Sequence, residues 1–287
     1  MIFMNRFVLV MFLSVVFCSC RQNAEKVADT LKVMSYNIRY DNPGDGENIW
    51  DIRKPATKAM IYDLRPDVFG VQEAQVHQIR YIEENCPHYA SVGVGRDDGK
   101  EAGEFMSIFY DKEKIKLLEW GTFWLSRTPE KPSRGWDAAC FRTATWAKME
   151  ILASGRQFFF YNTHLDHIGR NARKNGLELI VRTMKEKNTE GLPTVLTGDF
   201  NVTPDNIFAL DSVYAYLNNA AVTAAEADSL ATNNAFGKRD GKVIDYIWWK
   251  DFSGCKEYRV SRKEYDGIKY VSDHWPITAV LKFQDDV

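Results

Sequence analysis

The chain has 287 residues, of which 45% are hydrophobic and 13% aromatic, and its formal net charge at pH 7 is −2. Such a composition is typical of a globular protein with a large core, and length alone allows one or two domains. No internal repeat or low-complexity tract is visible. Without an excess of basic residues, the sequence lacks the electrostatic footprint of a protein that binds a long polyanion.

The first twenty residues have the pattern of an export signal. Asn5-Arg6 gives a positive start, an apolar run from Phe7 to Phe17 follows, and then comes Cys18-Ser19-Cys20. This run is too short to span a bilayer. The pattern resembles a bacterial lipoprotein signal in which Cys20 would be acylated, although Phe17 is bulkier than is usual at its position. A simply cleaved signal peptide is the alternative.

From this pattern we expect residues 1–20 to form the signal segment and residues 21–30 to form a linker. The mature protein would be exported and anchored to a membrane through an acylated Cys20, in the periplasm or at the cell surface, or otherwise secreted. Loss of residues 1–20 removes one Arg and no acid, which changes the net charge from −2 to −3. Only Cys86, Cys140 and Cys255 remain, and because their spacing matches no zinc site we expect buried small residues.

Apolar and alternating runs predict strands over residues 31–40, 67–73, 89–94, 105–110, 115–124, 142–151, 158–165, 193–197, 243–249, 258–265 and 277–283. Helical spacing predicts helices over 51–64, 76–84, 170–187 and 207–213. In the first strand Asn37 is unfavourable unless its amide has partners. The second strand is apolar until it ends in Glu73. Farther on, the long loop 125–140 is either a binding element or a surface loop.

Polar side chains also end the later strands. The strand over 158–165 closes in His164-Leu165-Asp166-His167, and the strand over 193–197 is followed by Gly198-Asp199-Phe200-Asn201. In an extended chain Asp199 and Asn201 point the same way, although Gly-Asp after a strand is also a common turn. Ligand sites of layered α/β proteins gather at strand ends, so these residues are candidates for one site.

Asp245 stands inside a strand of otherwise apolar residues. A carboxylate in such a position is expensive to bury unless a charge or a donor is paired with it. His274, in Ser272-Asp273-His274 at the entrance of the last strand, is the natural partner. We therefore expect an Asp245–His274 pair.

This ordered set of residues resembles the endonuclease/exonuclease/phosphatase superfamily. The set comprises Asn37, Glu73, Asn162-Thr163-His164, Gly198-Asp199-Phe200-Asn201, Asp245 and Ser272-Asp273-His274, and it spans nearly the whole mature chain. The resemblance implies a deoxyribonuclease I-like fold of class α/β: a four-layer α/β/β/α sandwich, with two mixed β-sheets packed face to face and helices outside. We expect a single catalytic domain over residues 31–284, in which each half of the chain supplies one sheet.

The resemblance also implies a chemistry and a role for each matched residue. Asn37, Glu73 and Asp273 would hold a divalent cation, and oxygen ligands without thiolates favour Mg²⁺ or Mn²⁺. The other matched residues would handle the water and the phosphate. Their implied roles are proton acceptor for His274 with Asp245 as its orienting partner, placement of the water or a phosphoryl oxygen for Asp199 and Asn201, and hydrogen bonds to the phosphate and the leaving oxygen for His164.

Three residues near this set have weaker assignments. Arg142 is a candidate phosphate clamp because a guanidinium group matches phosphate oxygens in a bidentate fork, but an arginine in a strand is also often a solubilising surface residue. Asp166 and His167 can equally be supporting or surface residues. His164 and His167 could suggest zinc, but no third soft ligand accompanies them.

The favoured function is an exported, divalent-metal-dependent phosphoester hydrolase, most simply a phosphodiesterase of the nuclease or exonuclease type, acting as a monomer. A phosphomonoesterase or sphingomyelinase-like enzyme, acting on lipid head groups, inositol phosphates or sugar phosphates, is the first alternative. A surface binding module without activity is the second. Nucleic acid as the substrate would call for a basic stripe along a groove, whereas this sequence offers only local basic clusters.

Overall fold

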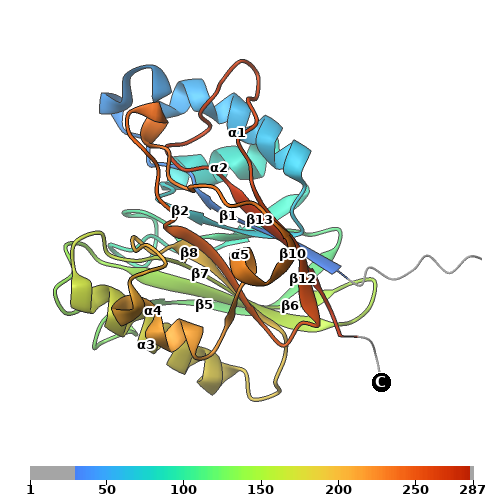
Figure 1. Ribbon diagram of the computed structural model, residues 1–287. Helices are drawn as coiled ribbons and strands as arrows, with labels where there is room; N and C mark the ends of the chain where they lie inside the picture. The colour runs from blue at the N-terminus through green and yellow to red at the C-terminus, as the bar shows by residue number, and fades with distance from the viewer. Residues whose placement is uncertain (1–29, 285–287) are drawn as a thin grey trace, which may run out of the picture.

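Two β-sheets lie face to face, with helices on the outer side of each sheet, in the computed structural model of the chain (Figure 1). The structure describes residues 30–284, so the export signal expected over residues 1–20 and the acylation expected at Cys20 lie outside the described residues. Within residues 30–284, no helix combines the length and the apolar character needed to cross a membrane.

The first half of the described chain contains β1 Thr30–Asn37, η1 Pro43–Asn48, α1 Trp50–Leu64, β2 Val68–Gln72, α2 Val76–Asn85, β3 Tyr89–Val92, β4 Ile108–Asp111, β5 Ile115–Trp124 and β6 Thr143–Ile151. The second half contains β7 Gln157–His164, α3 Arg170–Lys187, β8 Thr194–Asp199, α4 Ile207–Tyr214, β9 Asn218–Asn219, α5 Ala220–Thr223, β10 Ala224–Ala227, η2 Ala235–Gly237, β11 Asp245–Lys250, β12 Gly254–Val260 and β13 Ile277–Lys282. Most predicted elements are found with shifts of a few residues at their ends.

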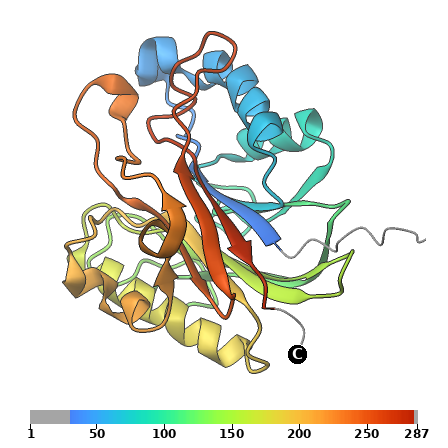
Figure 2. The same ribbon diagram turned by 45° about the vertical axis from the view of Figure 1, so that its right-hand side comes forward.

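Both sheets are mixed. The seven-stranded sheet has the order β10-β12-β13-β1-β2-β4-β3, and the six-stranded sheet has the order β5-β6-β7-β8-β11-β9. β1 pairs with β2 in parallel, as does β7 with β8, and β1 pairs with β13 in antiparallel fashion. In Figure 2 the C-terminal strands, in red, lie beside the blue β1. The two halves of the chain therefore do not each supply one sheet, because β10, β12 and β13 join the sheet that β1 begins.

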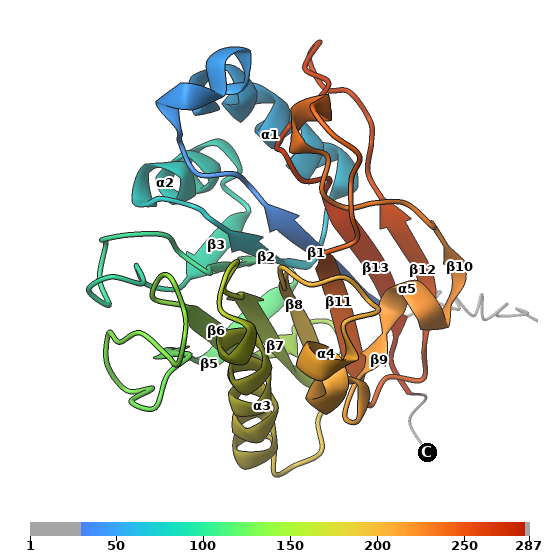
Figure 3. The same ribbon diagram turned by 60° about the vertical axis from the view of Figure 1, so that its left-hand side comes forward.

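Three apolar clusters hold the layers together. One lies between the sheets, a second joins the six-stranded sheet to α3 and α4, and a third joins the seven-stranded sheet to α1 and α2 (Figure 3). The sheets approach each other closely at Gly70 in β2. An added Cβ there would lie 2.4 Å from the Asn162 side chain and 2.5 Å from Thr197 Oγ1. Only glycine leaves room for these neighbours, which sit just below the strand ends.

Two strands and one cysteine differ from the sequence prediction. β8 continues through Gly198 to Asp199, so Gly198 does not end the strand. β12 spans Gly254–Val260 instead of 258–265, because Cys255, Tyr258 and Val260 are the residues that turn inward from it. Cys86 and Cys255 are buried as expected, whereas Cys140 is partly exposed and lines a cleft.

Candidate active site

The ends of four strands meet at one edge of the sandwich. β1 and β2 end there in one sheet, and β7 and β8 end there in the other. A hydrogen bond of 3.0 Å from Asn37 Nδ2 to Asp199 Oδ2 joins the two sheets at this edge. Beside it lies a cleft of about 360 Å³, lined by Arg39, Tyr40, Glu73, Arg96, Glu104, Cys140, Arg142, His164, His167, Asp199, Asn201, Asn233, Arg239, Ile244, Asp273 and His274.

Acidic groups gather on the β1 and β2 side of the cleft. Asn37 Nδ2 donates to Glu73 Oε1 at 3.1 Å as well as to Asp199, and Asn37 Oδ1 accepts from the Arg39 backbone N–H at 3.0 Å. Arg39 Nη1 lies 3.8 Å from Glu73 Oε2 and 3.9 Å from Asp273 Oδ2. Burial raises the pKa of Asp273, and the Glu73 carboxylate adds to the rise. This corner therefore carries an excess of negative charge that the Arg39 and Arg53 guanidinium groups offset in part.

The expected Asp245–His274 pair is present and buried. His274 Nδ1 lies 2.8 Å from Asp245 Oδ2 and 3.0 Å from Oδ1, and Thr232 Oγ1 donates to Oδ2 at 2.6 Å. Burial opposes the charged imidazolium, but the carboxylates of Asp245 and Asp199 outweigh it and raise the pKa of His274 well above its ordinary value. Because Nδ1 is held by Asp245, Nε2 is the nitrogen left to face the cleft, where the Asn233 amide lies 3.1 Å away.

Asp199 stands between two imidazole groups. Its Oδ2 is 3.8 Å from His274 Nε2 and 3.6 Å from His164 Nε2. Burial raises the pKa of Asp199 to about 7, and the neighbouring Asp245 carboxylate adds to the rise. The two imidazoles thus approach one carboxylate oxygen from two sides, and a group bound beside that oxygen lies within reach of both rings.

Asn201 connects the end of β8 to His164 at the end of β7. Its Nδ2 lies 3.0 Å from His164 Nε2 and donates to the Leu165 carbonyl at 3.0 Å, while its backbone N–H donates to Asp199 Oδ1 at 2.9 Å. Burial lowers the pKa of His164 well below its ordinary value, and the Arg142 guanidinium lowers it further. His164 is therefore a neutral imidazole whose ring position is set by Asn201.

Arg142 is buried beside the cleft, with only 5% of the residue exposed, which excludes the solubilising surface role. Its Nε donates to Asp166 Oδ2 at 3.4 Å, and its Nη2 lies 3.0 Å from His167 Nδ1. Asp166 also accepts backbone N–H groups from Ala139, Cys140, Ile168 and Gly169. Asp166 is thus a supporting residue for Arg142, whereas His167 is exposed at the rim.

Three non-glycine residues at the cleft have left-handed backbone conformations. The φ angles are 60° for Arg39, 63° for Glu73 and 51° for Asn201. Such conformations cost on the order of 1 kcal/mol each and persist where the surrounding structure imposes them, often at functional sites. Here each one follows the end of a central strand, and together they turn a guanidinium, a carboxylate and an amide towards the cleft.

The donor set fits a hard divalent cation. Glu73 and Asp273 supply carboxylate oxygens around the point where Arg39 Nη1 now lies, and Asn37 stands beside them. Oxygen ligands of this kind suit Mg²⁺ or Mn²⁺. Glu73, His164 and Asp199 also present ligand atoms within 4.8 Å of one another, as do Cys140, Asp166 and His167. In the last group both Asp166 oxygens are already hydrogen-bonded, so it offers a metal little.

Sequence reasoning missed seven of the residues that line the cleft: Arg39, Tyr40, Arg96, Glu104, Asn233, Arg239 and Ile244. All of them lie outside the named helices and strands, where no periodicity identifies an inward-facing side chain. Arg39 had a signal, because it shares a strand face with Asn37 in the predicted first strand. Glu104 could have been noticed because it is an acid directly before an apolar run, just as Glu73 is an acid directly after one.

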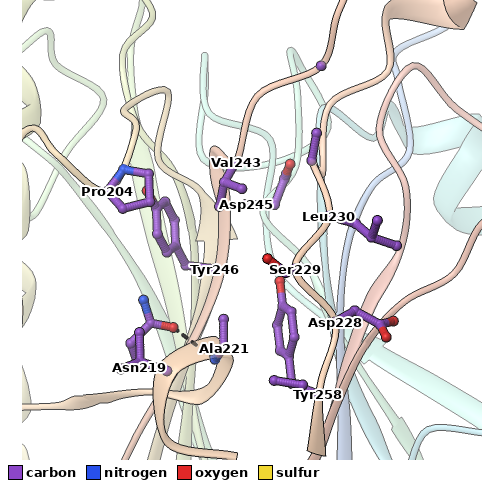
Figure 4. A pocket seen from close by; sticks show the side chains of 14 residues that line it. Pro204, Asn219, Ala221, Asp228, Ser229, Leu230, Val243, Asp245, Tyr246 and Tyr258 are labelled. Atoms are coloured by element: carbon purple, nitrogen blue, oxygen red, sulfur yellow. Dashed lines mark hydrogen bonds between the residues drawn. The ribbon is translucent and has the colours of Figure 1, made fainter.

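A second pocket of about 340 Å³ lies on the far side of β11, and Asp245 forms part of its wall. Figure 4 shows Pro204 and Tyr246 on one side of it and Leu230 and Tyr258 on the other. Its lining contains no Lys, Arg or His, and it includes the carboxylates of Asp228 and Asp245. A negatively charged group therefore fits the first cleft and not this pocket.

Fold and cleft together define a class of protein. A sandwich of two sheets, with carboxylates, buried imidazoles and guanidinium groups at the strand ends, is the arrangement of a metal-dependent hydrolase of phosphate esters. Comparison with known proteins agrees. The model of the Endonuclease/Exonuclease/phosphatase family matches residues 34–274. No curated protein sequence is similar enough to this chain to count as a match.

Solved structures give the same answer. An endonuclease/exonuclease/phosphatase from Bacteroides vulgatus is 37% identical, with a TM-score of 0.84, covering 89% of this chain and 99% of that chain. A mannosyl-6-phosphatase from Bacteroides thetaiotaomicron is 35% identical, with a TM-score of 0.83, covering 88% and 100%. TDP2 from D. rerio, complexed with single-stranded DNA product, is 17% identical, with a TM-score of 0.70, covering 88% and 99%.

The chain belongs to the endonuclease/exonuclease/phosphatase family. Members of this family are metal-dependent hydrolases of phosphoester bonds, and the expected fold is confirmed. The TDP2 likeness concerns the fold alone, because its sequence identity is low.

Proposed function

We propose that this protein is an Mg²⁺- or Mn²⁺-dependent phosphatase that acts on small phosphomonoesters. The observation that carries the proposal is the set of guanidinium groups around one small cleft: Arg39, Arg96, Arg142 and Arg239 all line it, together with His164 and His274. A phosphomonoester carries nearly two negative charges at neutral pH, and a diester carries one. The same cleft holds four carboxylates, Glu73, Glu104, Asp199 and Asp273, which a divalent cation would offset. The four guanidinium groups then favour the more highly charged monoester.

The size of the cleft supports the same conclusion. About 360 Å³ is the volume of a small-molecule site. A polynucleotide would gain its affinity from basic side chains distributed along a groove, and the chain has a net charge of −2. The sequence favoured a phosphodiesterase, and the arrangement of the cleft instead supports the monoesterase alternative. The 35% identity to a mannosyl-6-phosphatase is consistent with this choice.

Within this proposal the chain's own residues divide the work. The neutral form of His274, oriented by Asp245, presents Nε2 to the cleft and takes a proton from the attacking water. Asp199 and Asn201 position that water and a phosphoryl oxygen, and His164 lies on the other side of Asp199, where it steadies the leaving oxygen. Glu73 and Asp273, with Asn37, would hold the divalent cation, whose charge stabilises the negative charge of the phosphoryl group in the transition state.

Arg142 is the phosphate clamp of this arrangement. Asp166 and His167 fix two sides of its guanidinium, and Nη1 makes no hydrogen bond in the described structure. A phosphate oxygen would satisfy that buried donor. A guanidinium held in this way binds an oxyanion without losing much further side-chain entropy.

The test compares two chromogenic esters, p-nitrophenyl phosphate and bis-p-nitrophenyl phosphate, with Mg²⁺, with Mn²⁺ and with EDTA. We expect kcat/KM for the monoester to exceed that for the diester by roughly tenfold or more, and EDTA to abolish both reactions. A preference for the diester would contradict the proposal and restore the phosphodiesterase reading. Activity in the presence of EDTA would contradict the proposed dependence on a divalent cation.

We further propose that the protein is exported, with Cys20 as the acylated N-terminal residue of the mature form. The support is the order of charge, apolar run and cysteine in residues 1–20. Mass spectrometry of the mature protein from its host would identify the N-terminal residue and any attached acyl chains. An unmodified N-terminus after a different residue would support the simply cleaved signal, and an intact residue 1 would contradict export.

A further inference from the structure

We propose that the end of the cleft beyond His164 is a subsite for the hydroxyl groups of a sugar, formed by Arg96, Glu104 and Arg142. This inference rests on the proposed phosphatase function and names the class of substrate: phosphosugars, in which the phosphate is esterified to a polyhydroxylated leaving group. The sequence predicts Arg142 as a phosphate clamp. It gives Arg96 and Glu104 no role.

The Glu104 carboxylate is the centre of this subsite. Arg96 Nη1 donates to Glu104 Oε2 at 2.5 Å. The same oxygen is 3.9 Å from Arg142 Nη1 and 3.8 Å from His164 Nδ1. An acceptor and three donor groups therefore converge within one small volume, and all four residues line the cleft.

Three of the buried donors are left without a hydrogen bond. They are Arg96 Nε, Arg142 Nη1 and His164 Nδ1. A buried donor without a partner costs about 1–3 kcal/mol, so three of them around one carboxylate indicate that a ligand completes the set. A phosphate oxygen would satisfy Arg142 Nη1, and the hydroxyl groups of the sugar would satisfy Arg96 Nε and His164 Nδ1. Because Arg142 is only 5% exposed and His164 only 4%, bulk water does not reach most of their surface.

The chemistry of the four groups selects the ligand. A hydroxyl both donates and accepts a hydrogen bond, so a sugar diol can donate to Glu104 and accept from the neighbouring guanidinium groups. A nucleobase would need an aromatic face on which to stack, and an acyl chain would need an apolar wall. This end of the cleft has neither, because the cleft's one aromatic residue, Tyr40, packs against Arg39 at the acidic corner, 4.5 Å from the guanidinium carbon to the ring centroid.

The position of the subsite relative to the catalytic groups agrees with a leaving-group site. Displacement at phosphorus places the attacking and leaving oxygens roughly in line. His274 and His164 lie on two sides of Asp199 Oδ2, at 3.8 Å and 3.6 Å. With His274 beside the attacking water, the departing alcohol lies towards His164, and the Glu104 carboxylate is the next group beyond that ring.

The subsite is held rigid by its own loop and by a neighbouring strand. The Arg96 backbone N–H donates to the Glu104 carbonyl at 3.0 Å, so the two residues face each other across a narrow hairpin in the segment 93–107. Trp124 Nε1 at the end of β5 donates to the Arg96 carbonyl at 2.7 Å. Groups fixed before binding lose less entropy when a ligand arrives, which is the condition for selecting one arrangement of hydroxyls.

The test uses two primary alkyl phosphates of similar size. Mannose 6-phosphate carries ring hydroxyls, and cyclohexylmethyl phosphate has the same ring size and none. We expect wild-type kcat/KM for the sugar phosphate to be at least about 100-fold higher, because sites built for hydroxyls reject analogues that lack them. In Glu104→Gln this ratio should fall roughly tenfold or more, since Gln cannot accept from two guanidinium groups as a carboxylate does.

The matched control is Glu101→Gln. Glu101 lies in the same loop and also pairs with an arginine, Arg80, but this pair is exposed at the surface, so the ratio should stay at its wild-type value. An equal loss of activity on both esters in Glu104→Gln would overturn the inference, because Glu104 would then act only by orienting His164. An equal rate on both esters in the wild type would also overturn it.

A second variant, Arg96→Met, keeps the inference testable if Glu104→Gln does not fold. It keeps an unbranched side chain as far as the position of Nε and removes the donors, and its ratio should also fall roughly tenfold with an unchanged Tm. An unchanged ratio in a folded Arg96→Met would contradict the inference. Failure of the phosphatase function itself would be distinguishable, because the wild type would then hydrolyse neither alkyl phosphate and no p-nitrophenyl phosphate.

Discussion

Two imidazole–carboxylate pairs in this protein have the same chemistry and different surroundings. His274 and Asp245 are buried at the cleft, whereas His77 and Asp41 form an exposed pair with an N–O distance of 3.1 Å. Burial removes the screening water, so the carboxylate at the cleft changes the proton affinity of its histidine strongly. The comparison offers a direct experiment on the proposed proton acceptor.

His274→Ala should lower kcat by about 10²–10⁴-fold, the usual contribution of a general base. Asp245→Asn should lower it less, because the imidazole remains and loses only its orienting carboxylate. His77→Ala, which removes the ring of the exposed pair, should leave kcat and Tm unchanged. Steady-state kinetics with p-nitrophenyl phosphate measure all three, and a His274→Ala enzyme with near wild-type kcat would contradict the assignment.

The environment of Asp166 predicts how the free energy of unfolding depends on pH. Burial alone would raise the pKa of Asp166, but backbone N–H groups of Gly169, Ala139 and Ile168 outweigh it and lower the pKa to about 2 from 3.8. A lowered pKa means that the folded state binds the proton less well than the unfolded state. The stabilisation is therefore complete above about pH 4 and is lost as the pH falls towards 2.

Asp166→Asn should lower the free energy of unfolding by about 1–2 kcal/mol at pH 7, and the difference from wild type should shrink between pH 4 and pH 2. Urea unfolding at several pH values measures it. The exposed Asp51, paired with Lys54, supplies the control, because Asp51→Asn should change stability by less than about 0.5 kcal/mol. A difference that grows at low pH would contradict the account.

At the scale of the element, β2 lies so close to the opposite sheet that Gly70 has no room for a side chain. Gly70→Ala would push a methyl group into Asn162, which donates to the Val71 and Ser107 carbonyls at 2.7 Å and 3.0 Å. Overpacking and the loss of these hydrogen bonds should destabilise the protein by roughly 2–4 kcal/mol. Since Asn162 precedes His164 by two residues in β7, activity should fall as well.

Gly254→Ala is the matched control for Gly70→Ala. Gly254 begins β12, and an added Cβ there would meet nothing within 4 Å. Its Tm should stay within about 2 °C of the wild-type value, whereas Gly70→Ala should lower Tm by roughly 5–10 °C. Equal Tm values for the two variants would show that the sheets can move apart at β2 without cost.

The elements that could be predicted from the sequence are those whose pattern matches their burial. Glu73 and His164 stand out because each ends an apolar run, and the structure places both at the cleft. Asp245 stands out because a carboxylate in an apolar strand needs a partner. Glu104 and Asn233 escaped because they lie in loops, whose side-chain directions depend on contacts with distant strands and not on a local period. The assignment of β12 and β13 to the first sheet escaped because a local period predicts a strand and does not specify its pairing partner.

At the scale of the whole molecule, the acidic corner predicts a response to divalent cations. Glu73 and Asp273 come from opposite ends of the chain, and a cation bound between them only in the folded state would stabilise the whole fold. At 100 times its Kd, such a ligand contributes about 2.7 kcal/mol. Mg²⁺ or Mn²⁺ should therefore raise Tm, and EDTA should reverse the rise.

Glu73→Gln should remove most of this rise in Tm, because it takes away a carboxylate ligand. Glu119→Gln, a change on the exposed outer part of β5, should keep it. Differential scanning fluorimetry with and without the cation measures the shift without any substrate. A shift of wild-type size in Glu73→Gln would place the cation elsewhere.

The pairing of β1 with β13 brings Asn37 and His274 to the same edge of the sandwich although nearly the whole described sequence separates them. Ser272 Oγ donates to the Asn37 carbonyl at 2.7 Å and fastens the two segments together. A ribosome must therefore have made almost the entire polypeptide before any catalytic centre can exist. Premature stop codons anywhere upstream of Asp273 would yield products with no hydrolytic power, however well their remaining strands collapse.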